Sequence, residues 1–285
     1  MGIGSEIELP ELNRTDKEPQ VFVKIGKVKD GLETVEKSGV RFCANRNEFI
    51  LNLNTIGSFY VKGGNEIIVE PKKDVEDRAI RIFLLGSAFG ALLHQRGHFV
   101  FHASTVEYKN HAVCVSGVSG AGKSTLAKAL NNKGYKIISD DVTVVEFDGD
   151  DKPFVLPGLR RVKLWQDAAE KLGESFSEEK AIRKNVNKYT LNVQLPEGST
   201  ELKYVFILEP YNKDELEVSE IQSFQKVNEL IKNTYRFSFI SNSERKRHLE
   251  QCGKIANNVK MYKIFRPRKG FTLEKQIEII KGIMD

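Results

Sequence analysis

Residues 117–124 read Gly-Val-Ser-Gly-Ala-Gly-Lys-Ser, which matches the phosphate-binding loop pattern G-x-x-x-x-G-K-[ST]. Apolar residues 112–115 precede the loop and a helical pattern follows it from Lys123 to Leu130. Glycines let successive backbone N–H groups curl around a phosphate, and the helix N-terminus adds partial positive charge. The sequence therefore predicts nucleotide binding, with an ordinary glycine-rich turn as the alternative.

The loop residues have distinct expected roles. Lys123 should contact the outer phosphates, and the Ser124 hydroxyl should be a ligand of Mg²⁺. ATP and Mg²⁺ are the expected cofactors. The expected phosphate-binding residues are Gly117, Val118, Ser119, Gly120, Ala121, Gly122, Lys123, Ser124 and Thr125.

Two adjacent acids, Asp140 and Asp141, follow a short apolar strand, 17 and 18 positions after Lys123. Ligands in open α/β sheets bind beyond the carboxyl ends of the strands, so these acids should lie beside the loop. One carboxylate can hold Mg²⁺ while the other accepts a proton from an attacking hydroxyl. A solvent-exposed Asp-Asp turn is the alternative.

His102 ends an expected strand over residues 99–103, just before the loop strand. From there its imidazole could lie beside the acids and tune one of them, although a purely structural histidine is the alternative. His94, His98, His111 and His248 have no metal-ligand spacing with cysteine and are assigned no role.

Several cations could stabilise charge on a transferring phosphoryl group, with a surface location as the alternative for each. The candidates are Arg160, Arg161, Lys163 and Lys188. Arg266 and Arg268 flank Pro267 and are expected in a solvated turn, with a nucleotide contact as the alternative. Trp165 is expected to be a packing anchor, with a base-stacking platform as the alternative.

The segment FHASTVEYKNHAVCVSGVSGAGKSTLAKALNNKGYKIISDD resembles the catalytic domain of HPr kinase/phosphorylase, the bacterial serine kinase of a sugar-transport phosphocarrier. The strong match covers residues 98–145. The resemblance implies a fold akin to phosphoenolpyruvate carboxykinase cores. It also implies that Asp140 is the catalytic base, Asp141 an assisting or Mg²⁺-linked acid, and His102 the residue that tunes Asp140.

The overall layout resembles stand-alone HPr-kinase-like proteins, some of which phosphorylate a serine of a precursor peptide, as lasso-peptide tailoring kinases do. The segments LLGSAFGALLHQRG, HAS and LPGLRRVKLW carry this likeness. The family's Glu-Ile-Arg-Gly signature has no counterpart here, and the N-terminal block does not resemble its regulatory domain. A phosphocarrier substrate and reverse phosphorolysis therefore do not follow from the resemblance.

Composition is that of a globular protein: 285 residues, 40% hydrophobic, 29% charged, with a net charge of +5. No basic run or basic-aromatic interleaving points to nucleic acid as a partner. Three dispersed cysteines argue against a disulfide framework, no apolar stretch is long enough to span a membrane, and no signal peptide is visible. We expect a cytoplasmic protein without a membrane partner.

The expected fold class is α/β: a P-loop kinase core of the HPr kinase/phosphoenolpyruvate carboxykinase-like type, with an N-terminal β-rich region. Residues 1–72 form the β-rich region and residues 73–285 the catalytic domain. Gly86 and Gly90 are expected to allow a helix over about 74–95 to pack closely against a sheet. Later helices are expected at 167–173, 222–233, 242–256 and 272–284, with strands at 135–138, 142–147, 154–156, 161–164, 189–193, 204–208 and 261–265.

The expected function is a Mg-ATP-dependent kinase that transfers the γ-phosphoryl group to a serine-type hydroxyl of a peptide, protein or small molecule. A non-catalytic nucleotide-sensing module and an ATPase without an acceptor are the alternatives. The sequence does not identify the acceptor, and a homo-oligomer is compatible with it.

Overall fold

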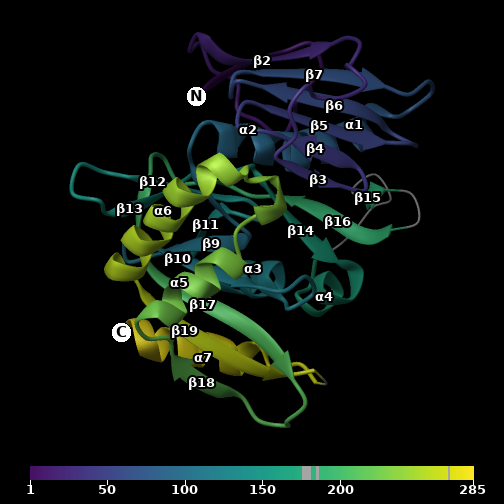
Figure 1. The fold of residues 1–285 in the computed structure, drawn as a ribbon. Helices are drawn as coiled ribbons and strands as arrows, with labels where there is room; N and C mark the ends of the chain where they lie inside the picture. The colour runs from purple at the N-terminus through teal and green to yellow at the C-terminus, as the bar shows by residue number, and fades with distance from the viewer. Residues whose placement is uncertain (175–180, 184–185, 269) are drawn as a thin grey trace. The chain divides into compact units, whose positions relative to one another are not determined.

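The computed structural model describes residues 1–174, 181–183, 186–268 and 270–285 of a mixed α/β protein (Figure 1). The chain forms two compact units: Met1–Val100 with Tyr235–His248, and Phe101–Thr234 with Leu249–Asp285. This division differs from the expected boundary after residue 72. The helical segment that follows belongs with the N-terminal sheet, since its Phe83 contacts Phe59 of that sheet at 6.5 Å between ring centroids.

The first unit is built on a seven-stranded sheet, as its aromatic and β-branched residues predict. Its predicted hairpin turns at Gly63 and Gly64, whose φ values of 60° and 68° suit glycine. In spatial order the strands are β1 (Gly2–Ser5), β2 (Pro19–Ile25), β7 (Glu66–Pro71), β6 (Gly57–Lys62), β5 (Glu48–Leu53), β4 (Phe42–Ala44) and β3 (Lys37–Gly39).

The predicted long helix of this unit is divided into α1 (Asp77–Phe83), a π-helical turn η1 (Leu84–Ala88) and α2 (Phe89–Gln95). Gly86 and Gly90 face the ring of Tyr235, and a Cβ added to Gly90 would lie 2.8 Å from its Cε1 atom. The helical segment packs against strand β6 of the sheet, as expected, while the close approach at Gly90 is made by the ring of Tyr235. The first unit also contains the short helices η3 (Phe237–Phe239) and η4 (Asn242–Glu244).

The second unit contains a larger sheet, in which β10, β17 and β19 are parallel neighbours. Their carboxyl ends meet at one edge, where ligands bind in sheets of this kind. The antiparallel neighbours β11 and β9 continue the sheet beside β10, and β13 and β12 continue it beside β17. The strands of this region are β8 (Phe99–Phe101), β9 (Ala103–Tyr108), β10 (His111–Gly117), β11 (Lys136–Ser139), β12 (Thr143–Phe147), β13 (Pro153–Leu156), β17 (Thr200–Tyr211), β18 (Glu217–Glu220) and β19 (Lys260–Pro267).

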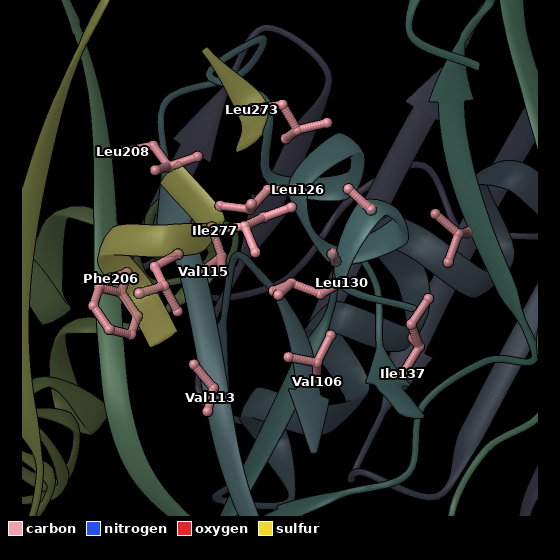
Figure 2. Close-up of a cluster of buried hydrophobic side chains, with 14 of the residues drawn as sticks. Val106, Val113, Val115, Leu126, Leu130, Ile137, Phe206, Leu208, Leu273 and Ile277 are labelled. Atoms are coloured by element: carbon pink, nitrogen blue, oxygen red, sulfur yellow. The ribbon is translucent and has the colours of Figure 1, made fainter. Parts of the chain in front are cut away.

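One face of this sheet is covered by two helices, α3 (Lys123–Asn132) and α7 (Leu273–Met284). Figure 2 shows Leu126 and Leu130 of α3 and Ile277 of α7 beside strand residues such as Val115 and Phe206. These side chains form one buried cluster, which anchors the helix that follows the phosphate-binding loop. The other long helices are α5 (Phe224–Lys232) and α6 (Arg245–Asn258).

A small third sheet consists of β14 (Arg161–Trp165), β16 (Val186–Asn192) and β15 (Ala181–Arg183), and β14 leads directly into α4 (Gln166–Lys171). Val162 and Leu164 are buried in the cluster with α3. Because side chains alternate along a strand, Arg161, Lys163 and Trp165 face the opposite side. This alternation directs Lys163 away from the apolar cluster.

The expected absence of a disulfide framework agrees with the structure, in which Cys43, Cys114 and Cys252 form no disulfide. Cys114 and Cys252 are buried, and burial raises the pKa of each thiol to about 12. Among the described residues, no helix is long and apolar enough to cross a membrane.

Two buried histidines lie within the first unit. His94 contacts the carbonyl oxygen of Tyr235 through Nε2 at 2.8 Å. His248 stacks on Phe99 and tilts against Phe237, with ring centroids 5.5 and 5.3 Å away. Burial lowers the pKa of both histidines from 6.5 to about 4, and nearby cationic side chains add to the effect.

We predict that this unit loses stability between about pH 6.5 and pH 4. The unfolded chain binds protons at His94 and His248 from about pH 6.5 downward, whereas the folded chain does so only near pH 4. For His94 alone the loss is about 3 kcal/mol. Urea unfolding midpoints at pH 7, 5.5 and 4.5 should decline less steeply in His248→Phe than in the wild type. Parallel declines in the two proteins would contradict the prediction.

Candidate active site

The phosphate-binding loop connects β10 to α3, as the sequence predicts. Gly117 has φ 134° and lies beside Leu208 of β17, whose carbonyl oxygen would be 2.3 Å from an added Cβ. Gly122 has φ 99° at the N-cap of α3. Glycine is therefore required by a close backbone approach at the start of the loop and by a left-handed turn at its end.

Lys123 is buried, and its ammonium group lies inside the loop. Its Nζ atom donates to the carbonyl oxygens of Gly117 at 2.9 Å and Val118 at 3.2 Å. The loop thus surrounds a positive charge at the N-terminus of a ten-residue helix. Both features favour an anion at this position.

Arg266, in β19, contacts the loop from the neighbouring part of the sheet. Its Nε atom donates to the carbonyl oxygen of Ala121 at 2.7 Å, and Nη2 donates to that of Gly120 at 3.4 Å. Burial lowers the pKa of Arg266, and the charge of Arg268 adds to this effect. The expectation of a solvated turn at Arg266 is therefore wrong, because its guanidinium holds the backbone of the loop.

The two acids differ sharply in their surroundings. Asp140 is buried, with Oδ1 accepting from the Ser104 hydroxyl at 2.6 Å and Oδ2 accepting from the backbone N–H of Lys163 at 2.9 Å. It thereby connects the end of β11 to β9 and β14. A cavity lies beside the phosphate-binding loop, and Asp140 is not among the residues that line it. Its expected assignment as the catalytic base does not fit this geometry.

Asp141 does line the cavity. Its Oδ2 atom accepts from the Lys163 ammonium at 2.8 Å, and its Oδ1 atom is 3.4 Å from Nδ1 of His102. Its backbone is left-handed, with φ 73°. Such a conformation costs a non-glycine residue about 1–3 kcal/mol and is typical of functional sites.

His102 lies between β8 and β9 and is fixed through its backbone. Its N–H donates to the carbonyl oxygen of Asn233 at 2.8 Å, and its own carbonyl oxygen accepts from the Ser116 hydroxyl at 2.8 Å. The ring contacts Asp141 rather than Asp140, the acid that His102 was expected to tune.

The proton position on His102 follows from its partner. Nδ1 lies 3.0 Å from the backbone carbonyl oxygen of Asp141, and since a carbonyl only accepts, Nδ1 must carry the proton. Burial lowers the pKa of His102, and the charge of Lys123 lowers it further, against an opposing effect of Asp141. The imidazole is therefore neutral near pH 7, with Nε2 deprotonated.

These groups share a cavity of about 510 Å³ in the second unit. Five cationic side chains and two acidic ones line it among the described residues, so the cavity favours an anionic ligand. Its walls include His102, Ser119, Gly120, Ala121, Gly122, Lys123, Ser124, Thr125, Asp141, Lys163, Trp165, Asp167, Ala168, Lys171, Arg266, Arg268, Gly270, Phe271, Thr272, Leu273 and Gln276.

Of the candidate cations, Lys163 is the one that contacts an acid of this cavity, while Arg160 and Arg161 are not among its walls. The side chain of Lys188 lies outside the described part of the chain. Trp165 is 50% exposed on the cavity wall, which does not fit the expected packing anchor.

Three contributing residues were missed from the sequence: Ser104, Asn233 and Phe271. Ser104 follows His102 by two positions, and strand alternation could have placed both on one face. Asn233 ends α5 and Phe271 precedes α7, and neither lies in a motif. Their roles arise from contacts between segments that are distant in the sequence.

The oxygen donors in the cavity can be compared with those that Mg²⁺ commonly takes. No group of three or more His, Cys, Asp or Glu residues that could hold a metal occurs within the described ranges. Mg²⁺ instead commonly binds through one or two protein oxygens together with phosphates and water. Ser124 and Asp141, the expected ligands, both line the cavity and fit this pattern.

No protein-family model matches the chain, and no curated protein matches it. Among solved structures, the Hpr(Ser) kinase/phosphatase from Coxiella burnetii matches 65% of this chain and 89% of its own, with 14% identity and a TM-score of 0.28. This is a weak structural similarity.

We predict that Gly117→Ala destabilises the protein more than Gly120→Ala. A Cβ at position 117 would meet the Leu208 carbonyl oxygen, whereas at position 120 no atom lies within 4 Å and only the φ of 80° disfavours alanine. We expect the free energy of unfolding to fall by about 1–2 kcal/mol in Gly120→Ala and by more in Gly117→Ala. Urea unfolding of both variants measures the difference, and equal losses would show that the approach of β17 does not constrain the loop.

Proposed function

We propose that the protein is a Mg-ATP-dependent kinase that transfers the γ-phosphoryl group to a serine-type hydroxyl. The observation that carries this proposal is the placement of two sets of groups in one cavity. The first set, Lys123 and Ser124, is suited to a triphosphate. The second set is the Asp141 carboxylate, which can accept a proton, with His102 and Lys163 in contact with it.

The triphosphate is bound by charge and backbone dipoles. The glycines of the loop leave room for phosphate oxygens at the N-terminus of α3, and Lys123 supplies a point charge there. Arg266 holds the carbonyls of Ala121 and Gly120, so that the loop keeps its shape before a ligand arrives. Such preorganisation lowers the cost of binding.

Mg²⁺ would be held by the Ser124 hydroxyl, with one carboxylate oxygen of Asp141 as a further ligand, directly or through water. When bound, it neutralises charge that develops on the phosphoryl group. Both of these oxygen donors, on Ser124 and Asp141, line the cavity.

Asp141 is also the carboxylate placed to accept the proton of an attacking hydroxyl. The Lys163 ammonium, 2.8 Å from Oδ2, compensates its negative charge, and the neutral ring of His102 holds its backbone carbonyl. Asp140 acts through its neighbour: its hydrogen bonds to Ser104 and Lys163 set where Asp141 lies. Asp140 is thus a positioning residue.

The acceptor is a peptide, protein or small molecule with a serine-type hydroxyl. The sequence resembles HPr-kinase-like proteins, including those that phosphorylate a precursor peptide, so peptides and small proteins encoded beside the gene are the first acceptors to test. The proposal includes neither phosphorolysis nor a phosphocarrier substrate.

We predict that Asp141→Asn and Asp140→Asn fail in different ways. Asp141→Asn should lower transfer of labelled γ-phosphate by at least about 10³-fold, because it removes a carboxylate from the reacting centre. Its melting temperature should stay near that of the wild type, and so should its affinity for ATP measured without Mg²⁺. Asp140→Asn should lower the melting temperature, because the amide nitrogen replaces an oxygen that accepts a buried hydrogen bond.

Asp167→Asn is the matched control, since Asp167 lines the same cavity away from these contacts, and it should keep transfer near the wild-type rate. Full transfer in Asp141→Asn would remove Asp141 from its role. Tight ATP binding without turnover would favour a nucleotide-sensing module. Phosphate release that exceeds transfer to every hydroxyl tried would favour an ATPase.

We predict that His102→Asn keeps more activity than His102→Ala. The asparagine amide can place a donor near the Nδ1 position and so hold the Asp141 carbonyl, whereas alanine removes the hydrogen bond. We expect the rate of phosphoryl transfer to fall about tenfold in His102→Ala and by less in His102→Asn. Steady-state rates of phosphoryl transfer between pH 5.5 and 8 check this prediction. If both variants lose the same activity, and the fall in rate at low pH disappears in both, His102 would instead have a proton-transfer role.

A further inference from the structure

Two large aromatic side chains are half exposed on the cavity wall. Trp165 is 50% and Phe271 51% exposed, although each ring could bury a large apolar area. Aromatic rings that remain open inside a ligand cavity commonly provide its contact surface. Neither ring is used by the phosphate or proton chemistry described above.

The two rings lie along the wall in a defined order. Trp165 faces the same side of β14 as Lys163, whose ammonium contacts Asp141. From Trp165, α4 extends the wall for six residues, about 9 Å, to Lys171. The Nζ atom of Lys171 lies 5.1 Å from the centroid of the Phe271 ring. Phe271 is therefore separated from the Asp141 end by the length of α4.

The loop helix connects these two ends. Ser124 and Thr125, in the first turn of α3, line the cavity together with Leu273 and Gln276, in the first turn of α7. Leu126 and Leu273 lie in the same buried cluster, which holds the two helix starts together (Figure 2). A phosphate chain on the α3 N-terminus thus has the acid at one end and the Lys171–Phe271 pair at the other.

We propose that Phe271, at the end of the cavity wall away from Asp141, provides the stacking surface of a nucleobase-binding subsite, with Trp165 on the wall between that subsite and the acid. This inference rests on the proposed function. With the terminal phosphoryl group beside Asp141, the base extends toward the aromatic end, where stacking holds its planar ring. The acceptor hydroxyl must approach Asp141, so an acceptor side chain is not the occupant of this end.

The test compares two ligands that share the same phosphates. Calorimetry with Mg²⁺ gives the affinities of ATP and of inorganic triphosphate. Trp165 is the only tryptophan of the chain, so its fluorescence reports on the wall directly. We expect ATP to bind at least about tenfold more tightly than triphosphate, and both ligands to change the fluorescence of Trp165.

Phe271→Ala should weaken ATP by about tenfold and leave the affinity for triphosphate unchanged. Phe224→Ala is the matched control: Phe224 is 72% exposed in the same unit and is not among the cavity walls, so neither ligand should be affected. Equal affinities of the wild type for the two ligands, or equal weakening in Phe271→Ala, would overturn the subsite and leave the kinase proposal standing. Failure of both ligands to bind would overturn the two together.

Discussion

The buried carboxylate of Asp140 is the contact on which the candidate site depends. It is 7% exposed, and each of its oxygens accepts a hydrogen bond, one from β9 and one from β14. Removing a carboxylate from water is costly unless such bonds replace its hydration, so the surrounding strands are held in one arrangement. The next residue turns left-handed at once, which directs Asp141 into the cavity. One acid therefore provides the position and the other the chemistry.

The charges around Asp141 form a balanced set. Its carboxylate contacts the Lys163 ammonium, and it partly offsets the effect of Lys123 on His102. Because Lys123 and burial both oppose protonation of the imidazole, His102 stays neutral and can hold the Asp141 carbonyl as a donor. A protonated ring would add a further positive charge beside the loop, where the cavity is already cationic.

Local patterns predicted the strand, loop and helix around residues 112–130, because each depends on neighbours in the sequence. The position of the acid pair at a strand end followed from the same reasoning. Which acid faces the cavity could not be predicted, since it depends on the backbone turn at Asp141 and on Lys163, 22 positions away. The contact of Arg266 with the loop spans 145 positions and leaves no local pattern. The same holds for Tyr235 against Gly90.

Polar side chains also form a buried chain of contacts within the sheet next to the two acids, where apolar residues would be expected. The hydroxyl of Thr143 bonds those of Ser139 at 2.7 Å and Thr105 at 2.9 Å, and Thr105 in turn contacts the Cys114 sulfur at 3.1 Å. Apolar residues would pack here in several registers, whereas a buried hydroxyl chain is satisfied in few. These bonds join β11 and β12 through β9 to the loop strand β10. The acids and the loop are consequently supported by one network, and a shift of either would leave buried hydroxyls without partners.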